Sequence, residues 1–197
     1  MPAGSPVILC DVMGTLVYNP FFVEIPAFFG MSLEELRGCK HPTSWIEFES
    51  GAITQDIYLA RLFTDCRLFN HEEFLACVAS AYRWLDGMEA CVADLRAAGH
   101  AVHTLSNYPL WYRTIEEKLK LSRYVEWTFV SCLTGLRKPA QEAFLNAARH
   151  LGRAPRECVL IDDSSENCTA AGVAGMPSIH FHNAADLRLE LGSRGLI

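Results

Sequence analysis

The chain has 197 residues, of which 50% are hydrophobic, and its formal net charge is −6. This size suits one domain with a modest insertion, and the acidic balance without a block of cations argues against a nucleic-acid partner. No apolar stretch approaches the roughly 20 residues that a membrane-spanning helix needs. The opening residues 1–6 are too short for a signal peptide, because the first predicted strand follows at once.

The eight cysteines form no Cys-x-x-Cys pair, and several of them lie inside apolar runs. This distribution predicts reduced core residues in a reducing compartment rather than a disulfide framework. A chain of this length can bury a sizeable core and does not need cross-links to fold.

The first predicted strand is the apolar run 7–10, and Asp11 follows at its carboxyl end. A short apolar run bounded by turn residues is typical of a buried strand. Asp11 opens the turn Asp11-Val12-Met13-Gly14-Thr15. In parallel α/β sheets ligands bind outside the carboxyl ends of the strands, so Asp11 is placed for chemistry. A plain turn-capping role for Asp11 is the structural alternative.

Helical periodicity without a strand pattern fills the next stretch, up to about residue 85. Helices are predicted over 22–29, 32–38, 45–50, 54–66 and 71–82. Ser32 and Glu35 have the spacing of a capping box. We expect most of the many aromatic side chains here to fill a helical core, whereas Phe21 and Phe22 follow the Asp11 turn closely enough to line a pocket.

Strands and helices alternate through the rest of the chain. Helices are predicted over 87–98, 110–119, 139–151, 166–174 and from about 184, with strands over 101–105, 127–131, 158–161 and 178–181. This alternation indicates right-handed crossovers and a parallel sheet. We therefore predict an α/β core formed by residues 1–18 and 86–197, with the helical segment 19–85 inserted after the first strand.

Two later strands also end in polar side chains, as the first does. Ser106 and Asn107 follow the strand 101–105, and Asp162 and Asp163 follow the strand 158–161. Lys138 lies between them in the chain, in a turn before a helix. A solvated Asp-Asp loop and an ordinary surface lysine are the alternatives for these positions.

The order Asp11, Ser106, Lys138 and Asp162-Asp163, on these elements, resembles the four signature motifs of the haloacid dehalogenase superfamily. The resemblance runs along essentially the whole chain. It implies a Rossmannoid parallel sheet flanked by helices, with a small all-helical cap of the C1 type that closes over the strand ends. It also implies phosphoryl transfer, in which Asp11 attacks phosphorus and forms an aspartyl phosphate.

The same resemblance implies a Mg²⁺ site. Asp11, Asp163 and the backbone carbonyl of Met13 would be ligands, and Asp162 would bind the metal or hold a coordinated water. Asn167 would orient the groups around the ion. Mg²⁺ takes carboxylates and waters in an octahedral shell, and a buried cluster of carboxylates without a cation would be costly.

A phosphate site is implied beside the metal. Ser106 and the Asn107 amide would hold phosphate oxygens, and Lys138 would neutralise the phosphate and the nucleophile together. Attack by an anion on an anionic phosphate needs cations close by, which is the physical reason for a lysine here.

Met13 departs from the superfamily pattern, in which phosphatases usually carry a second Asp two residues after the nucleophile. That Asp is the general acid and base, a role worth roughly 10²–10⁴-fold in rate. His41, whose imidazole suits proton transfer at neutral pH, and Glu47, with a pKa raised by burial, are the cap residues that could replace it. A metal-bound water is the alternative, and so is a purely structural role for both side chains.

Methionine at position 13 is also what the flavin mononucleotide (FMN) hydrolases of plant and algal plastids carry. Segments that resemble this group are 26–31, 39–42, 45–49, 107–112, 118–122 and 127–129. Gly14 and Ala140 differ, because Asp is usual at both positions. The resemblance implies Mg²⁺-dependent hydrolysis of FMN to riboflavin and phosphate, in the plastid stroma, with the cytoplasm as the alternative location.

Flavin is compatible with the aromatic cap, because stacking of aromatic side chains on a flat ring contributes about 0.5–1.5 kcal/mol each. A catalytically weak phosphate- or flavin-binding protein of the same fold is the alternative function, since Met13 cannot transfer a proton. Phosphate release from FMN with and without Mg²⁺ separates the two.

Overall fold

The computed structural model describes residues 5–197, so most of the opening segment 1–6 lies outside the described residues. Its centre is a five-stranded parallel sheet in the order β3-β2-β1-β4-β5. The strands are β1 (Val7–Cys10), β2 (Val102–Ser106), β3 (Glu126–Val130), β4 (Cys158–Asp162) and β5 (Ser178–His180). The predicted parallel α/β fold is confirmed.

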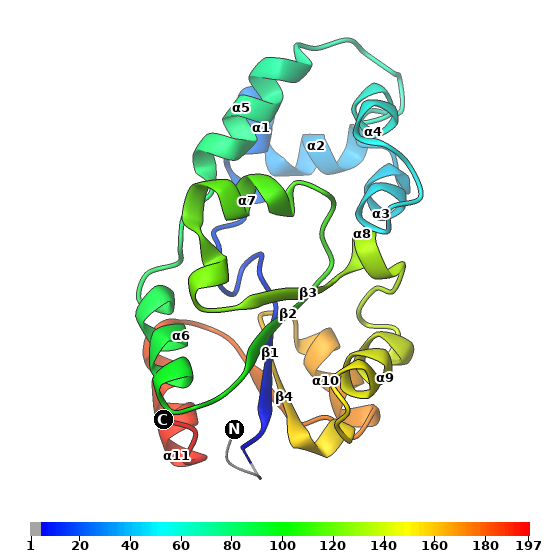
Figure 1. Ribbon diagram of the computed structural model, residues 1–197. Helices are drawn as coiled ribbons and strands as arrows, with labels where there is room; N and C mark the ends of the chain where they lie inside the picture. Colours follow the sequence, from blue (N-terminus) through cyan, green and yellow to red (C-terminus); the bar gives the residue numbers. More distant parts are fainter. Residues whose placement is uncertain (1–4) are drawn as a thin grey trace.

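Helices cover both faces of the sheet (Figure 1), with α6 (Met88–Ala97) and α11 (Ala184–Ser193) on one face and α9 (Gln141–His150) and α10 (Ser165–Val173) on the other. The β1 side chains alternate between two cores because successive residues of a strand point to opposite faces. Ile8 and Cys10 belong to the larger core, and Val7 and Leu9 to the smaller one. This double burial explains why the strand is uniformly apolar.

Five helices of the inserted segment lie together beyond the carboxyl ends of the strands (Figure 1). They are α1 (Glu24–Phe28), α2 (Leu33–Cys39), α3 (Ser44–Glu49), α4 (Gln55–Ala60) and α5 (His71–Ala81), preceded by the 3₁₀ turn η1 (Pro20–Phe22). The predicted capping box starts α2, with the Ser32 amide donating to Glu35 Oε2 at 2.7 Å. We propose residues 19–85 as the cap.

Two predicted helices of this segment differ from the structure. The segment 22–29 is divided between η1 and α1, and the segment 54–66 is helical only to Ala60. The chain turns after Ala60 because Phe63 forms an isolated β-bridge with Lys40. This contact joins residues far apart in the sequence, so it cannot be predicted from the spacing of apolar residues within one helix.

The remaining elements lie between β2 and β4 in the chain. They are α7 (Tyr112–Leu119), η2 (Leu121–Arg123), α8 (Ser131–Thr134) and η3 (Pro155–Glu157). The predicted strand 127–131 ends one residue earlier, where Ser131 starts α8. All eight cysteines are free, and none of the helices in residues 5–197 has the length and apolarity to cross a bilayer.

Candidate active site

The polar strand ends converge at one edge of the sheet. Asp11 directly follows β1, Ser106 ends β2 and Asp162 ends β4, and these three strands are neighbours. The pairing of Cys10 with both Thr104 and Ile161 places the strand ends level with one another. Parallel pairing therefore brings together side chains that lie about 150 residues apart in the sequence.

Lys138 is buried between two carboxylates. Its Nζ lies 2.8 Å from Asp11 Oδ1 and also contacts Asp162 Oδ2. Lys138 is 2% exposed, Asp11 7% and Asp162 fully buried. A solvated surface role for this lysine is thus excluded by the structure, and one ammonium faces two carboxylates in a site with little water.

Burial sets the acid–base behaviour of this group. It raises the pKa of Asp11 to about 7, opposed by the Lys138 ammonium, which favours the carboxylate. Burial alone would lower the pKa of Lys138, but the carboxylates of Asp11 and Asp162 outweigh it, and the net shift is upward. The lysine is therefore held as a cation beside the nucleophile candidate.

Asn107 positions Lys138 through the backbone. Its Oδ1 accepts from the Lys138 amide at 2.8 Å, and its Nδ2 donates to the Lys138 carbonyl at 2.7 Å. The neighbouring Ser106 hydroxyl is buried and has no hydrogen-bond partner in residues 5–197. An unpartnered buried hydroxyl is costly, so an acceptor from a ligand would satisfy it.

Asp162 has no free oxygen for a metal. Its Oδ1 accepts from the Ser164 amide at 2.9 Å and from Asn167 Nδ2 at 3.0 Å, while its Oδ2 accepts from Lys138 and from the same Asn167 amide. Both carboxylate oxygens of Asp162 are thus engaged inside the protein, and its role at the metal, as a ligand or through a coordinated water, stays a prediction. Asn167 thus holds the Asp162 carboxylate in place beside Lys138, and it also lines the pocket.

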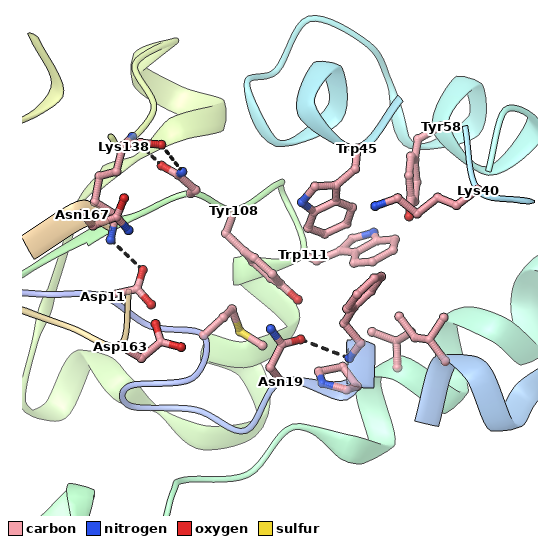
Figure 2. Close-up of a pocket in the computed structure, with 16 residues that line it drawn as sticks. Asp11, Asn19, Lys40, Trp45, Tyr58, Tyr108, Trp111, Lys138, Asp163 and Asn167 are labelled. Atoms are coloured by element: carbon pink, nitrogen blue, oxygen red, sulfur yellow. Dashed lines mark hydrogen bonds and ion pairs between the residues drawn. The ribbon is translucent and has the colours of Figure 1, made fainter. Parts of the chain in front are cut away.

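Asp163 faces the pocket instead, at the same end as Asp11 (Figure 2). Its amide donates to Thr15 Oγ1 at 3.1 Å and its carbonyl accepts from His180 Nε2 at 3.0 Å. Gly14 lies against it with φ +88°, and a Cβ there would overlap the Asp163 carboxylate. Glycine at position 14 thus leaves room for this carboxylate.

The residues present fit a magnesium ion. Three carboxylates, Asp11, Asp162 and Asp163, lie near one lysine, Lys138, which contacts only the first two, so the site has an excess of negative charge. Residues 5–197 contain no group of three His, Cys, Asp or Glu side chains that could hold a metal. Mg²⁺ often binds through one or two carboxylates and completes its shell with waters and substrate phosphate. We propose Asp11 and Asp163, with the Met13 carbonyl, as such a set.

A cavity of about 390 Å³ opens beside these carboxylates, between the core and the proposed cap. Asp11, Lys138 and Asp163 lie at one end of it (Figure 2), and Met13 also lines it. Its volume lies in the range of small-molecule sites. Phe21 lines it as expected, whereas Phe22 is 52% exposed and takes no part.

Aromatic side chains from several elements form the other end (Figure 2). Trp45 comes from α3, Tyr58 from α4, and Tyr108 and Trp111 from the segment after β2. The Trp45 ring packs against the other three with centroids 5.5–5.9 Å apart. Helical spacing predicts a core position for most of the cap aromatics and cannot reveal this wall, because it does not distinguish a core from a pocket lining.

His41 and Glu47 do not line the cavity. Arg61 lies between them, with Nη1 3.0 Å from Glu47 Oε2 and Nη2 3.3 Å from His41 Nε2. Hydrogen bonds from Thr43 and Arg61 lower the pKa of Glu47, the opposite of what a general acid needs. The structure thus assigns both side chains to a polar cluster on the cap surface.

With this geometry established, the family is clear. The chain matches the haloacid dehalogenase-like hydrolases over residues 7–175. It belongs to this family, and it is an enzyme, a phosphoric monoester hydrolase, as the sequence motifs predicted.

Individual proteins that resemble this chain include two curated relatives and one solved structure. The chain is 44% identical over 191 residues to flavin mononucleotide hydrolase 1 of Arabidopsis thaliana, named as chloroplastic, covering 97% of this chain and 78% of that protein. It is 27% identical over 173 residues to the sesquiterpene phosphatase AstK of Aspergillus oryzae, covering 82% and 84%. A haloacid dehalogenase family enzyme of Bacteroides thetaiotaomicron, solved with magnesium and inorganic phosphate, has the same fold, with a TM-score of 0.75, 21% identity and coverage of 91% and 96%.

Proposed function

We propose that this hydrolase converts FMN to riboflavin and phosphate. The observation that carries the proposal is a single cavity that joins a carboxylate–lysine cluster at one end to an aromatic wall at the other. A phosphate suits the first end and a flat ring the second. The 44% identity to a plant FMN hydrolase supports the same substrate, and that relative's name suggests a plastid location.

Asp11 is the proposed nucleophile. Its carboxylate oxygen attacks phosphorus, the bond from phosphorus to the ribityl oxygen breaks, and an aspartyl phosphate forms. Water then attacks phosphorus, releasing phosphate and restoring the carboxylate. Lys138 stays protonated and neutralises charge beside the nucleophile, while the Ser106 hydroxyl and the Asn107 amide donate to phosphate oxygens.

Magnesium is proposed as the cofactor, held by Asp11, Asp163 and the Met13 carbonyl. When bound, it would neutralise the negative charge shared by the nucleophile and the substrate phosphate. Since the Met13 side chain has no acidic proton and His41 and Glu47 lie outside the cavity lining, we propose that water protonates the ribityl oxygen. The alternative of a catalytically weak binding protein is not favoured, because the extensive identity is to an enzyme.

The test is hydrolysis of FMN, measured as phosphate release and as riboflavin separated by chromatography. We expect turnover with Mg²⁺ and its loss with a chelator. Asp11→Asn should reduce kcat by at least about 10³-fold, because removal of a covalent nucleophile has effects of this size or larger. Asp86→Asn, the same change at an exposed aspartate outside the cavity lining, is the control. Activity retained in Asp11→Asn would overturn the covalent mechanism.

A further inference from the structure

Lys40 is a lysine that the proposed chemistry does not use. It ends α2, where its amide donates to the Leu36 carbonyl, and its half-buried side chain lines the cavity. The structure shows no carboxylate oxygen within 4.0 Å of its Nζ in residues 5–197. The Nζ lies instead 5.1 Å from the centre of the Phe21 ring. The side chain is thus a cation in an aromatic setting without an ion-pair partner.

The nearby acid does not supply that partner. Glu49 favours the charged form of Lys40, but its carboxylate is paired with Arg137, with 2.6 Å between Oε1 and Nε. Burial dominates, and the pKa of Lys40 is lowered. Partial burial of a cation without an anion or acceptor is unfavourable. The contact with Phe21 offsets part of that cost, since a cation over an aromatic face gains about 0.5–2 kcal/mol.

The position of Lys40 excludes the substrate phosphate as its partner. Figure 2 shows Lys40 beside Trp45 and Tyr58, at the opposite end of the cavity from Asp11 and Asp163. A phosphate attacked by Asp11 cannot reach it. An acceptor supplied to Lys40 by a bound substrate would therefore belong to the organic part of that substrate.

We propose that Lys40 determines substrate specificity by donating a hydrogen bond to an acceptor edge of a flat ring held at the aromatic end of the cavity. The inference rests on the proposed function, because a phosphate at Asp11 fixes which end receives the ring. In FMN the carbonyl oxygens and ring nitrogens of the isoalloxazine supply such an edge. A protein charge near these nitrogens also changes the electron distribution of the flavin ring. A phosphate ester of a plain terpene alcohol or polyol lacks this edge and gains nothing from Lys40.

The test compares ring binding with phosphate binding in Lys40→Met and Lys40→Gln, which remove the charge while keeping a long side chain. Binding of FMN and of riboflavin is followed by quenching of flavin fluorescence, and inorganic phosphate is titrated as a competitor of FMN. We expect the Kd values of both flavins to rise about tenfold or more, the range for a hydrogen bond to a charged group. The inhibition constant of phosphate should stay within about twofold of wild type, because phosphate binds at the other end.

Two further variants sharpen the result. Arg37→Met removes an exposed cation from the same helix and should leave both flavin Kd values unchanged. Lys40→Arg keeps the charge and the donor and should recover most of the affinity. Under turnover, Lys40→Met should raise KM for FMN with kcat nearly unchanged, the signature of lost binding in both ground and transition states.

Failure of this inference is distinct from failure of the proposed function. Unchanged riboflavin affinity in folded Lys40→Met or Lys40→Gln would overturn the role of Lys40, whatever the rate of FMN hydrolysis. A wild-type protein that binds riboflavin through Lys40 but releases no phosphate would overturn the proposed reaction and leave the ring site standing. An equal loss of phosphate and riboflavin binding would also contradict the inference, since it would show a general collapse of the cavity.

Discussion

Met13 stands at the position where related phosphatases usually carry their general acid and base. It lies two positions after Asp11, lines the cavity and is 9% exposed, yet it has no proton to transfer. Its backbone is held by a bridge to Val17, so the side chain can change without moving the proposed carbonyl ligand. A change of this side chain therefore tests the acid–base role of the position without removing the backbone carbonyl that is proposed as a metal ligand.

Met13→Asp is expected to raise kcat for FMN, since general acid–base catalysis is worth about 10²–10⁴-fold when the group reaches the leaving oxygen. We expect a gain of about tenfold or more, measured as phosphate release at saturating FMN and Mg²⁺. Met13→Asn is the matched control, because its similar side chain cannot act as an acid. An unchanged or lower kcat in a folded, Mg²⁺-binding Met13→Asp variant would show that the site does not simply lack the usual acid.

Gly14 is constrained by its backbone and by its neighbour. A side chain at φ +88° costs about 1–2 kcal/mol, and the added Cβ would also push the Asp163 carboxylate away. Gly14→Ala should lower the free energy of unfolding in urea by about that amount and raise the Mg²⁺ concentration needed for half-maximal activity. Gly38→Ala, inside α2 with no heavy atom within 4 Å of the new Cβ, should instead stabilise by about 1 kcal/mol. Equal effects of the two would contradict this explanation.

At the level of elements, α3 is fastened to the loop that carries Lys138. Glu49, at the end of α3, is 3% exposed and is paired with Arg137, the residue before Lys138. The Ser131 hydroxyl at the start of α8 donates to the Glu49 carbonyl and accepts from the Tyr108 amide at 2.9 Å. The cap helix, the aromatic wall and the lysine loop are thus joined by one set of polar contacts.

Arg137→Met should destabilise the protein, because it leaves the buried Glu49 carboxylate without its cation. Breaking a buried pair costs roughly 3–5 kcal/mol, and since Arg137 is about one third exposed we expect about 2 kcal/mol. Urea unfolding at neutral pH measures the loss. Adding Glu49→Gln to Arg137→Met should recover part of it, and a double variant no more stable than Arg137→Met would contradict the buried-charge explanation.

At the scale of the whole molecule, the sheet itself contains a pH-sensitive group. His103 lies near the start of β2, with Nδ1 2.8 Å from Thr128 Oγ1 on β3. Burial lowers its pKa below the ordinary value of 6.5, opposed by Glu126. The unfolded chain therefore binds a proton more readily than the folded one as the pH falls below about 6.5.

Stability should consequently be lost as the pH is lowered from about 6.5 through the folded pKa of His103, and be retained above it. One histidine contributes a slope of at most about 1.4 kcal/mol per pH unit. Urea midpoints across this range measure the slope, and His103→Gln should flatten it while keeping a side chain able to donate to Thr128. The partly buried His71, changed to Gln, is the control for a histidine outside the sheet. An identical slope in wild type and His103→Gln would refute the assignment.

Much of the catalytic end could be predicted from the sequence because its signals are local. Short apolar runs identify strands, and parallel pairing then forces the residues after them, Asp11, Ser106 and the Asp162-Asp163 pair, to one edge. The sequence could not show which of the two adjacent aspartates faces the cavity, since neighbouring residues at a strand end point in different directions. Only the folded chain shows that Asp162 turns inward to Lys138 and Asn167 while Asp163 faces the cavity.

The aromatic end of the cavity could not be predicted from the sequence, because it is formed by tertiary packing alone. Its wall draws Phe21, Lys40, Trp45, Tyr58 and Trp111 from separate elements, and periodicity within any one of these elements predicts only that a side chain is buried. Whether a buried side chain meets another helix or an empty space depends on how the cap helices pack onto the core. By itself the sequence determined the sheet, the family and the positions of the strand-end carboxylates, because strand alternation and strand-end residues can be read from consecutive positions. The packing between segments far apart in the chain determined the cavity, and with it the position of Lys40 at the aromatic end.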